Sequence, residues 1–247
     1  RAGFQVAAVA NDAVEGAREL AAPIPGCEVM SAQEVADSCS LVFVTTPDEI
    51  IAKASATVRW RSGMGVVHCS GVTEVAALDA AAQAGASTGG FHPMQTFGDP
   101  RTAMETLPGC TITVEAGEPL DAVLVDMAQK LGCRVNRLPP GMRARYHAAA
   151  GFTSQFINAL FAQAAQVWGS WGATPEDALR ALMPLARGTL AAIENAGIAG
   201  GMPGPVSRGD VASIDKHVKA LSGLGPEMMA FYRVMCDRTI PLALERG

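Results

Sequence analysis

The sequence contains no long apolar segment, no cluster of basic residues and no closely spaced cysteine pair. A membrane-spanning helix needs about 20 consecutive apolar residues, and no run approaches that length. The net charge of −5, with 17% charged residues, favours neither nucleic acid nor a membrane surface as a partner. The six cysteines are scattered, and no Cys/His cluster has zinc spacing. We therefore expect a cytoplasmic protein with reduced thiols and no metal, whose partner is a small molecule or another protein.

The sequence also lacks the glycine fingerprint with which many dinucleotide-binding domains hold a pyrophosphate. Such a loop lies between a strand and the next helix, where backbone N–H groups face the phosphates. Gly63-Met-Gly65 precedes a strand pattern and residues 197–204 lie between helices, so neither fits. Arg1-Ala-Gly3 resembles the last turn of a helix with Gly3 as its left-handed residue. We therefore expect the sequence to begin after the first strand, loop and helix. We also expect no signal peptide ahead of its first apolar run.

Apolar runs alternate with helical patterns as far as residue 138. Strands are expected at 5–10, 41–45, 65–68, 86–91, 111–115 and 133–138, and helices at 13–22, 32–38, 75–84 and 119–131. This alternation favours parallel strands joined by βαβ crossovers. The predicted fold is α/β, a doubly wound Rossmann-type sheet without its first strand.

Pro139-Pro140-Gly141 ends this alternation, and no later segment has a strand pattern. Helices are expected at 146–168, 175–186, 187–196, 210–221 and 226–244. We place a Rossmann-like domain at residues 1–138 and an all-helical domain at residues 141–247. The helix at 146–168 has few charges on any face, which predicts a place at the centre of a bundle or in a subunit interface.

The segment Phe91-His-Pro-Met-Gln-Thr-Phe97 places His92 directly after a strand, which Pro93 ends. In open α/β sheets, ligands bind beyond the carboxyl ends of the strands. His68-Cys-Ser-Gly71 ends the neighbouring strand, so Ser70 is expected within hydrogen-bond reach of His92. We predict His92 as the acid/base and Ser70 as its catalytic partner. The alternative is that Pro93 makes a turn and His92 hydrogen-bonds a loop carbonyl.

Further polar residues are predicted to bind the substrate. His147, Ser154 and Asn158 are spaced i, i+7, i+11 on one helical face, which either lines a cavity or satisfies buried neighbours; we favour the cavity. Arg208 offers a guanidinium fork for a substrate carboxylate. Gln95 follows His92 in the same motif and is predicted to contact the substrate as well.

Five motifs together resemble a known family. They are Leu41 to Asp48 (LVFVTTPD), His68 to Gly71, Phe91 to Phe97, Tyr146 to Ala150 (YHAAA) and Gly204 to Asp210 (GPVSRGD), with His217 beyond. The chain resembles Rossmann-like oxidoreductases whose C-terminal half is a domain of unknown function with a 6-phosphogluconate dehydrogenase-like helical fold. These belong to the superfamily of pyrroline-5-carboxylate reductase and 6-phosphogluconate dehydrogenase. The resemblance implies a homodimer formed through the helical domain.

The expected cofactor is NAD or NADP. Asn11-Asp12 stands where such folds carry the acid that contacts the ribose, although Asp12 has an alternative place as N-cap of the next helix. The acid favours NAD slightly, because no arginine for a 2′-phosphate directly follows. Thr45, Thr46 and Pro47, in the first of the five motifs, complete the predicted cofactor contacts.

The predicted function is nicotinamide-dependent hydride transfer to or from a small, carboxylate-bearing substrate. Ser70 and His92 also stand where prephenate dehydrogenases carry a serine and a His-Pro-Met histidine, so a similar activity is one alternative. A non-catalytic binding or regulatory module with the same fold is another. A metal enzyme is disfavoured because no two histidines form an i, i+4 pair.

Overall fold

The computed structural model describes residues 2–246, with all their side chains except those of Pro100 and Arg101. The chain divides into two compact units, Arg1–Thr153 and Ser154–Gly247, which we call the sheet unit and the helical unit. Arg1 of the expected helix end lies outside the described residues. Gly3 has a φ of +82°, in the left-handed region expected for a residue after a helix.

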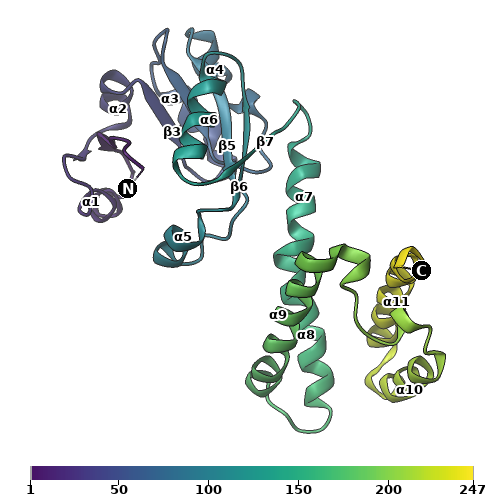
Figure 1. Ribbon diagram of the computed structural model, residues 1–247. Coiled ribbons are helices and arrows are strands. Elements are labelled where there is room, and N and C mark those ends of the chain that lie inside the picture. The colour runs from purple at the N-terminus through teal and green to yellow at the C-terminus, as the bar shows by residue number, and fades with distance from the viewer. Residues whose placement is uncertain (1, 247) are drawn as a thin grey trace. The chain divides into compact units, whose positions relative to one another are not determined.

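A five-stranded sheet forms the centre of the sheet unit (Figure 1). Its strands are, in spatial order, β3 (Leu41–Val44), β4 (Gly65–His68), β5 (Ser87–Pro93), β6 (Thr111–Ala116) and β7 (Arg134–Arg137). Neighbours pair in parallel except β5 and β6, which are antiparallel. The parallel pairing expected from the alternation of strands and helices is therefore wrong at this one step. Pro93 pairs with Ile112, so the link between the two strands begins and ends at the same edge of the sheet and makes no crossover.

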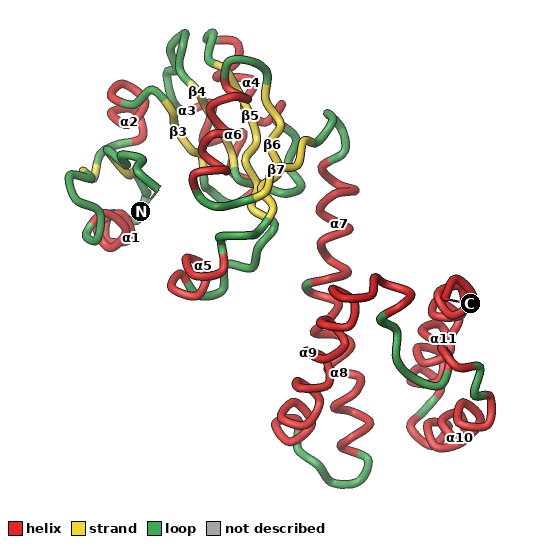
Figure 2. The backbone as a smooth tube through the Cα atoms, in the orientation of Figure 1, coloured by secondary structure: helices red, strands yellow, loops and turns green. Residues whose placement is uncertain are grey.

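A second, two-stranded sheet lies apart from the first, as Figure 2 shows. It consists of β1 (Ala8–Val9) and β2 (Glu28–Val29), paired in parallel. β2 has no counterpart among the strands expected from the sequence, because its two residues carry too short a pattern to recognise.

Nine α-helical and 3₁₀ segments belong to the sheet unit over the described residues. They are α1 (Val14–Ala21), α2 (Ala32–Ser38), η1 (Asp48–Ile50), α3 (Ile51–Thr57), η2 (Val75–Leu78), α4 (Asp79–Gln83), α5 (Pro100–Thr106), α6 (Leu120–Lys130) and α7 (Arg143–Thr153). α2 begins at Ala32 because Ser31 and Glu34 form a reciprocal capping box. α5 was not expected; it begins after Asp99, whose carboxylate accepts from the backbone N–H of Thr102 at 2.8 Å.

Both faces of the five-stranded sheet are covered by helices. The successive β4 residues Val66 and Val67 are fully buried in opposite apolar clusters, since side chains alternate along a strand. Val66 packs with side chains of α3, η2 and α4, and Val67 belongs to the cluster that contains Leu120 and Leu124 of α6. In Figure 1, α6 accordingly lies on one face of the sheet and α3 and α4 on the other. This is the doubly wound arrangement expected from the sequence.

The helical unit contains no strand within the described residues. Its elements are α8 (Gln155–Gly169), α9 (Pro175–Gly200), η3 (Val206–Arg208), α10 (Val211–Leu221), η4 (Ser222–Leu224) and α11 (Pro226–Arg246). α9 was expected as two helices but continues through Pro184 until Gly197, whose φ of 76° interrupts the helix. Asp210 caps α10 as expected, because its carboxylate accepts from the N–H of Ser213 at 3.0 Å.

The helix expected at 146–168 is two helices. α7 ends at Thr153, Ser154 has non-helical φ and ψ of −126° and −92°, and α8 follows. Thr153-Ser154 is a pair of weak helix formers, which makes it a favourable place for a break. The boundary between the two compact units falls at this break in the chain, so α7 is grouped with the sheet unit, whereas the domain boundary was expected at residues 138–141. None of the described helices is long and apolar enough to cross a membrane.

Candidate functional site

His92 and Tyr146 form a hydrogen-bonded pair at the carboxyl end of β5. Nδ1 of His92 lies 2.7 Å from the hydroxyl oxygen of Tyr146, and the two rings meet edge to face with centroids 5.5 Å apart. β5 positions His92 one residue before Pro93, and the first turn of α7 positions Tyr146. The tautomer of His92 decides which of the two groups donates this hydrogen bond.

His147, the next residue of α7, lies near the same imidazole. Its ring centroid is 6.3 Å from that of His92. A Cβ atom placed on Gly71 would lie 2.6 Å from Cδ2 of His147 and 2.8 Å from Nε2 of His92. Both histidine rings therefore depend on a glycine at position 71, the end of the His68-Cys-Ser-Gly71 motif.

A buried arginine connects α7 to the sheet next to this pair. The side chain of Arg143 is completely buried; its Nε donates to a carboxylate oxygen of Glu115 at 2.6 Å and its Nη1 to the carbonyl of Ser70 at 2.7 Å. Nη2 is buried without a hydrogen-bond partner among the described residues. A Cβ atom on Gly90 would overlap Nη2, so the guanidinium occupies the space left by that glycine.

The environment keeps the buried His68 and the half-buried His92 neutral near pH 7. Burial, then the positive charges of His147 and Arg143, lowers the pKa of His92 to about 4. Burial and Arg143 also lower the pKa of His68 to about 4. Burial raises the pKa of the Tyr146 hydroxyl, which is therefore protonated at neutral pH. A neutral imidazole hydrogen-bonded to a phenol can pass a proton in either direction by exchanging tautomers.

The hydrogen bond expected between Ser70 and His92 is absent from the described residues. The buried hydroxyl of Ser70 instead accepts from the backbone N–H groups of Val72 and Thr73, at 3.3 and 2.9 Å. A serine hydroxyl readily closes such a local turn, and this competes with reaching a neighbouring strand. Gln95 is likewise engaged away from His92, since its amide donates to the carbonyl of Thr106, the last residue of α5, at 3.1 Å.

The residues expected to contact a cofactor follow β1 and β3. Asn11 accepts from the backbone N–H of Ala13 at 2.9 Å, and Ala13 is the N-cap of α1, so the alternative N-cap role of Asp12 is wrong. Asp12 is exposed. Beyond β3, Thr45 and Pro47 are exposed, whereas Oγ1 of Thr46 is buried without a hydrogen-bond partner in the described part of the chain.

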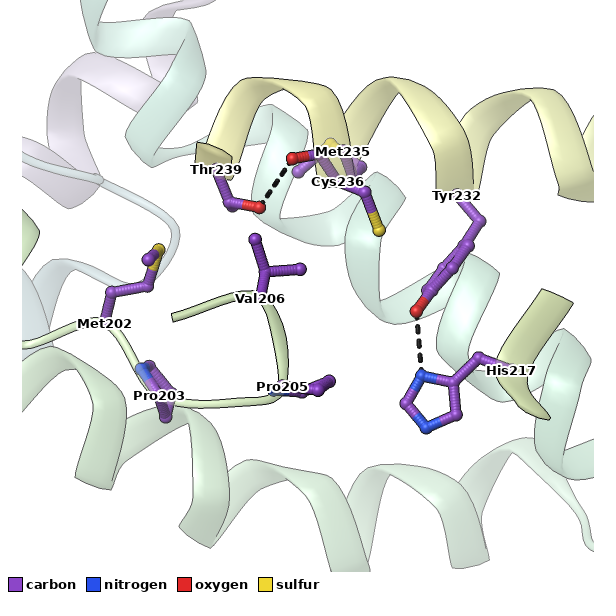
Figure 3. A pocket seen from close by; sticks show the side chains of 9 residues that line it. All are labelled: Met202, Pro203, Pro205, Val206, His217, Tyr232, Met235, Cys236 and Thr239. Atoms are coloured by element: carbon purple, nitrogen blue, oxygen red, sulfur yellow. Dashed lines mark hydrogen bonds between the residues drawn. The ribbon is translucent and has the colours of Figure 1, made fainter. Parts of the chain in front are cut away.

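The remaining predicted residues lie in the helical unit, and their role stays a prediction. Ser154 and Asn158 are exposed, and the break at Ser154 removes the continuous helical face on which they were grouped with His147. Arg208, at the end of η3, is exposed. Figure 3 shows a pocket of this unit that none of these three residues lines. In it, Nδ1 of His217 lies 2.8 Å from the hydroxyl of Tyr232.

Sequence reasoning missed four residues of the sheet-unit site: His68, Glu115, Arg143 and Tyr146. Tyr146 stood in a recognised motif next to His147 and was the one with a usable signal, because a tyrosine beside a predicted site histidine is a natural hydrogen-bond partner. Arg143 gave no signal. Arginine is almost never fully buried unless it is paired, and the sequence does not reveal that Glu115 is the partner. Within residues 2–246, no three His, Cys, Asp or Glu side chains come together as a metal site would require.

Several solved structures have a fold similar to that of this chain. Protein TM1727 from Thermotoga maritima is 20% identical, with a TM-score of 0.79 over 96% of this chain and 90% of the other. Protein BF3122 from Bacteroides fragilis, described as a candidate NADP oxidoreductase, is 25% identical, with a TM-score of 0.73 over 98% and 90%. The 1-pyrroline-5-carboxylate reductase of Streptococcus pyogenes is 12% identical, with a TM-score of 0.60 over 96% and 88%. The fold is thus that of Rossmann-type reductases with a helical C-terminal part.

No curated protein matches the chain in sequence. A family profile, described as a domain of unknown function (DUF2520), matches residues 110–239, which is more than half of the chain. The matched segment begins before β6 and ends within α11, so it includes Glu115, Arg143 and Tyr146. The chain therefore belongs to the DUF2520 family.

Proposed function

We propose that the protein is an NAD(P)-dependent oxidoreductase that transfers a hydride to or from a small, carboxylate-bearing substrate. The hydrogen-bonded pair of His92 and Tyr146 at the carboxyl end of β5 is the observation that carries the proposal. Ligands of open α/β sheets bind at this edge, and a hydride transfer requires a partner group that moves a proton. The oxidoreductase description of BF3122 supports the same class of reaction.

The proton steps follow from the two tautomers of His92. When Nδ1 carries the proton and donates to the Tyr146 oxygen, Nε2 has a free lone pair and accepts the substrate hydroxyl proton as the hydride leaves the same carbon. Nδ1 passes its own proton to the Tyr146 oxygen, and the hydroxyl proton of Tyr146 goes to solvent, so the ring ends neutral. When the Tyr146 hydroxyl donates to Nδ1, Nε2 carries a proton and donates it in the reverse reaction, while Tyr146 passes its hydroxyl proton to Nδ1 and takes up a proton from solvent. The lowered pKa of His92 keeps the imidazole neutral, so both tautomers are available at neutral pH.

A nicotinamide ring, when bound, supplies the acceptor or donor of the hydride. The chain fits such a cofactor in part: Asp12 follows β1, and beyond β3 Thr46 presents a buried hydroxyl that has no hydrogen-bond partner among the residues described. We assign no residue to the pyrophosphate, because residues 2–246 contain no glycine fingerprint between a strand and a helix.

For the choice of nicotinamide we propose NAD. The exposed carboxylate of Asp12 favours the ribose hydroxyls and repels a 2′-phosphate. The nearby Arg18 is paired with Glu15 at 3.1 Å and so is partly neutralised. Fluorescence titration with NADH and NADPH tests this, and a preference for NADPH, the cofactor type named for BF3122, would overturn it.

Oxidation of NADH or NADPH with a panel of small keto and imino acids tests the function. His92→Asn should lower turnover by about two to four orders of magnitude and leave cofactor binding unchanged, because it removes a positioned acid/base. His217→Asn, the same substitution in the other His–Tyr pair, is the matched control and should leave turnover unchanged. Cofactor binding without turnover of any substrate would instead indicate a non-catalytic module.

A further inference from the structure

A pocket of about 420 Å³ lies within the helical unit and carries two arginines. Arg208, at the end of η3, and Arg246, at the end of α11, both line it, together with Asn195 of α9 and Ser207. All the lining residues come from the helical unit. None of those described is acidic, so the pocket has a positive charge that its own walls do not neutralise.

The two guanidinium groups differ in how they are held. Nη1 of Arg246 donates to the backbone carbonyl of Met202 at 3.1 Å, which fixes this side chain to the segment before η3. Arg208 has no hydrogen bond or ion pair at its side chain among residues 2–246. The nearest acid in sequence, Asp210, caps α10, where its two oxygens accept from the N–H and hydroxyl of Ser213. These hydrogen bonds, and the charge of Arg208, lower the pKa of the Asp210 carboxyl, but Asp210 makes no hydrogen bond to Arg208 among the described residues. The donors of Arg208 therefore remain available for a ligand.

The wall of the pocket is built by close packing of a glycine-rich segment on α9. Gly201 is buried, and a Cβ atom there would lie 2.6 Å from backbone atoms of Ala192 and Ile193. Glycine at this position lets the chain return along α9, and the turn that follows leads directly into η3 and Arg208. The arrangement of the two arginines thus depends on a packed backbone and not on two independent surface side chains.

We propose that this pocket binds the carboxylate groups of a small organic acid, with Arg208 and Arg246 as the charged donors and Asn195 and Ser207 as neutral ones. A guanidinium matches the two oxygens of a carboxylate with parallel hydrogen bonds. The volume lies within the range of pockets for small organic ligands and leaves room for more than a single inorganic ion. This site goes beyond the proposed function, with which it shares the expectation of a carboxylate ligand and Arg208, the residue that the sequence pattern assigned to the substrate.

Isothermal titration calorimetry of the whole chain without a nicotinamide cofactor tests the site. Glutarate, citrate and inorganic phosphate are titrated separately at constant ionic strength. We expect the organic acids to bind, and Arg208→Gln and Arg246→Gln each to weaken that binding by about tenfold or more, as for the loss of a charged hydrogen bond. Arg208→Lys should give an intermediate loss, because it keeps the charge but removes the fork.

Arg187→Gln, which removes an exposed arginine of α9 outside the pocket, is the matched control and should change the affinity less than about twofold. Circular dichroism checks that every variant is folded. Absence of binding, an equal affinity for phosphate, or an equal loss in Arg187→Gln would overturn the proposal. Because the measurement needs no turnover, it tests this binding site separately from the proposed oxidoreductase activity. Either proposal can fail while the other stands.

Discussion

Nε of Arg143 lies 2.6 Å from a carboxylate oxygen of Glu115, and this ion pair joins α7 to β6 inside the sheet unit. The arginine side chain is 0% exposed and the glutamate side chain 12%. The same guanidinium holds the carbonyl of Ser70, which follows β4. Tyr146 stands one helical turn after Arg143, so the ion pair fixes the helix that presents Tyr146 to His92.

Removal of one partner of this ion pair should strongly destabilise the protein. Glu115→Gln leaves the Arg143 charge buried without a counter-ion, and breaking a buried pair in this way costs about 3–5 kcal/mol. Urea unfolding followed by circular dichroism measures the effect. Glu15→Gln is the control, because it breaks the Arg18–Glu15 pair, whose side chains are 66% and 78% exposed, and exposed pairs contribute about 0–1 kcal/mol. Equal losses in the two variants would show that burial of the pair is not important.

Gly90→Ala should destabilise the protein through Arg143. A methyl group at position 90 overlaps Nη2 of Arg143, which is fixed by two other hydrogen bonds and cannot move without breaking them. The double variant Gly90→Ala, Arg143→Ala should therefore lose less stability than the sum of the single variants, by about 1–3 kcal/mol, as expected for residues in contact. Strictly additive losses in the double-mutant cycle would contradict the steric explanation.

Tyr146→Phe should lower kcat by about fivefold with little change in KM. The substitution keeps the ring against His92 but removes the hydroxyl that selects the imidazole tautomer, and one such hydrogen bond contributes about 1 kcal/mol. Tyr232→Phe, which removes the hydroxyl of the His217 pair, is the control and should leave kcat unchanged. A KM effect alone, or an equal effect of both variants, would remove Tyr146 from the proton path.

Stability should decrease as the pH falls from about 6.5 to about 4. The folded-state pKa of His68 and His92 lies near 4, below the ordinary value of 6.5, so the unfolded chain binds more protons in this window. The stability contributed by the neutral histidines is fully present above pH 6.5 and is lost as the pH falls toward 4. His68→Asn should reduce the slope of unfolding free energy against pH in this window. An unchanged slope in His68→Asn would mean that His68 titrates alike in both states.

The central part of the fold could be predicted because its patterns are local. β4 has the expected bounds, Gly65–His68, and α2 the expected bounds, Ala32–Ser38, since an apolar run and a capping box identify them within a few residues. The antiparallel pairing of β5 and β6 could not be predicted, because strand direction depends on the path of the link between them. The break at Ser154 was missed because weak helix formers permit a break without requiring one.

The candidate site was predictable only where position along a strand determines it. Pro93 marks the end of β5, so His92 could be assigned to the carboxyl edge of the sheet. Tyr146 lies 54 residues later, and its hydrogen bond depends on how α7 packs against the sheet. Ser70 was assigned to His92 because their strands are neighbours, but the local turn to Val72 and Thr73 satisfies its hydroxyl.

The helical unit should form a homodimer, the partner that the family resemblance implied. Large apolar side chains are exposed along α8 and α9: Phe156, Leu160, Leu179, Leu185, Leu190 and Ile198. In the described part of this unit, the buried apolar side chains are those of Ala178 and Met228. They make a very small core for a unit of six α-helical and 3₁₀ elements. Burial of exposed apolar area against a second copy would supply the missing stabilisation. Sedimentation velocity over a range of concentrations should therefore show a dimer.

Leu179 and Leu190 offer a sharp test of that dimer. They are 48% and 53% exposed and stand eleven residues apart on α9, which places them on one face. Leu179→Gln together with Leu190→Gln should weaken dimerisation by at least about tenfold, because each buried leucine contributes about 1.5–3 kcal/mol. Val123→Gln, which changes a residue 47% exposed on α6 of the sheet unit, is the matched control. If the unaltered chain sediments as a monomer at every concentration, or if the control weakens the dimer equally, the helical unit does not form the interface.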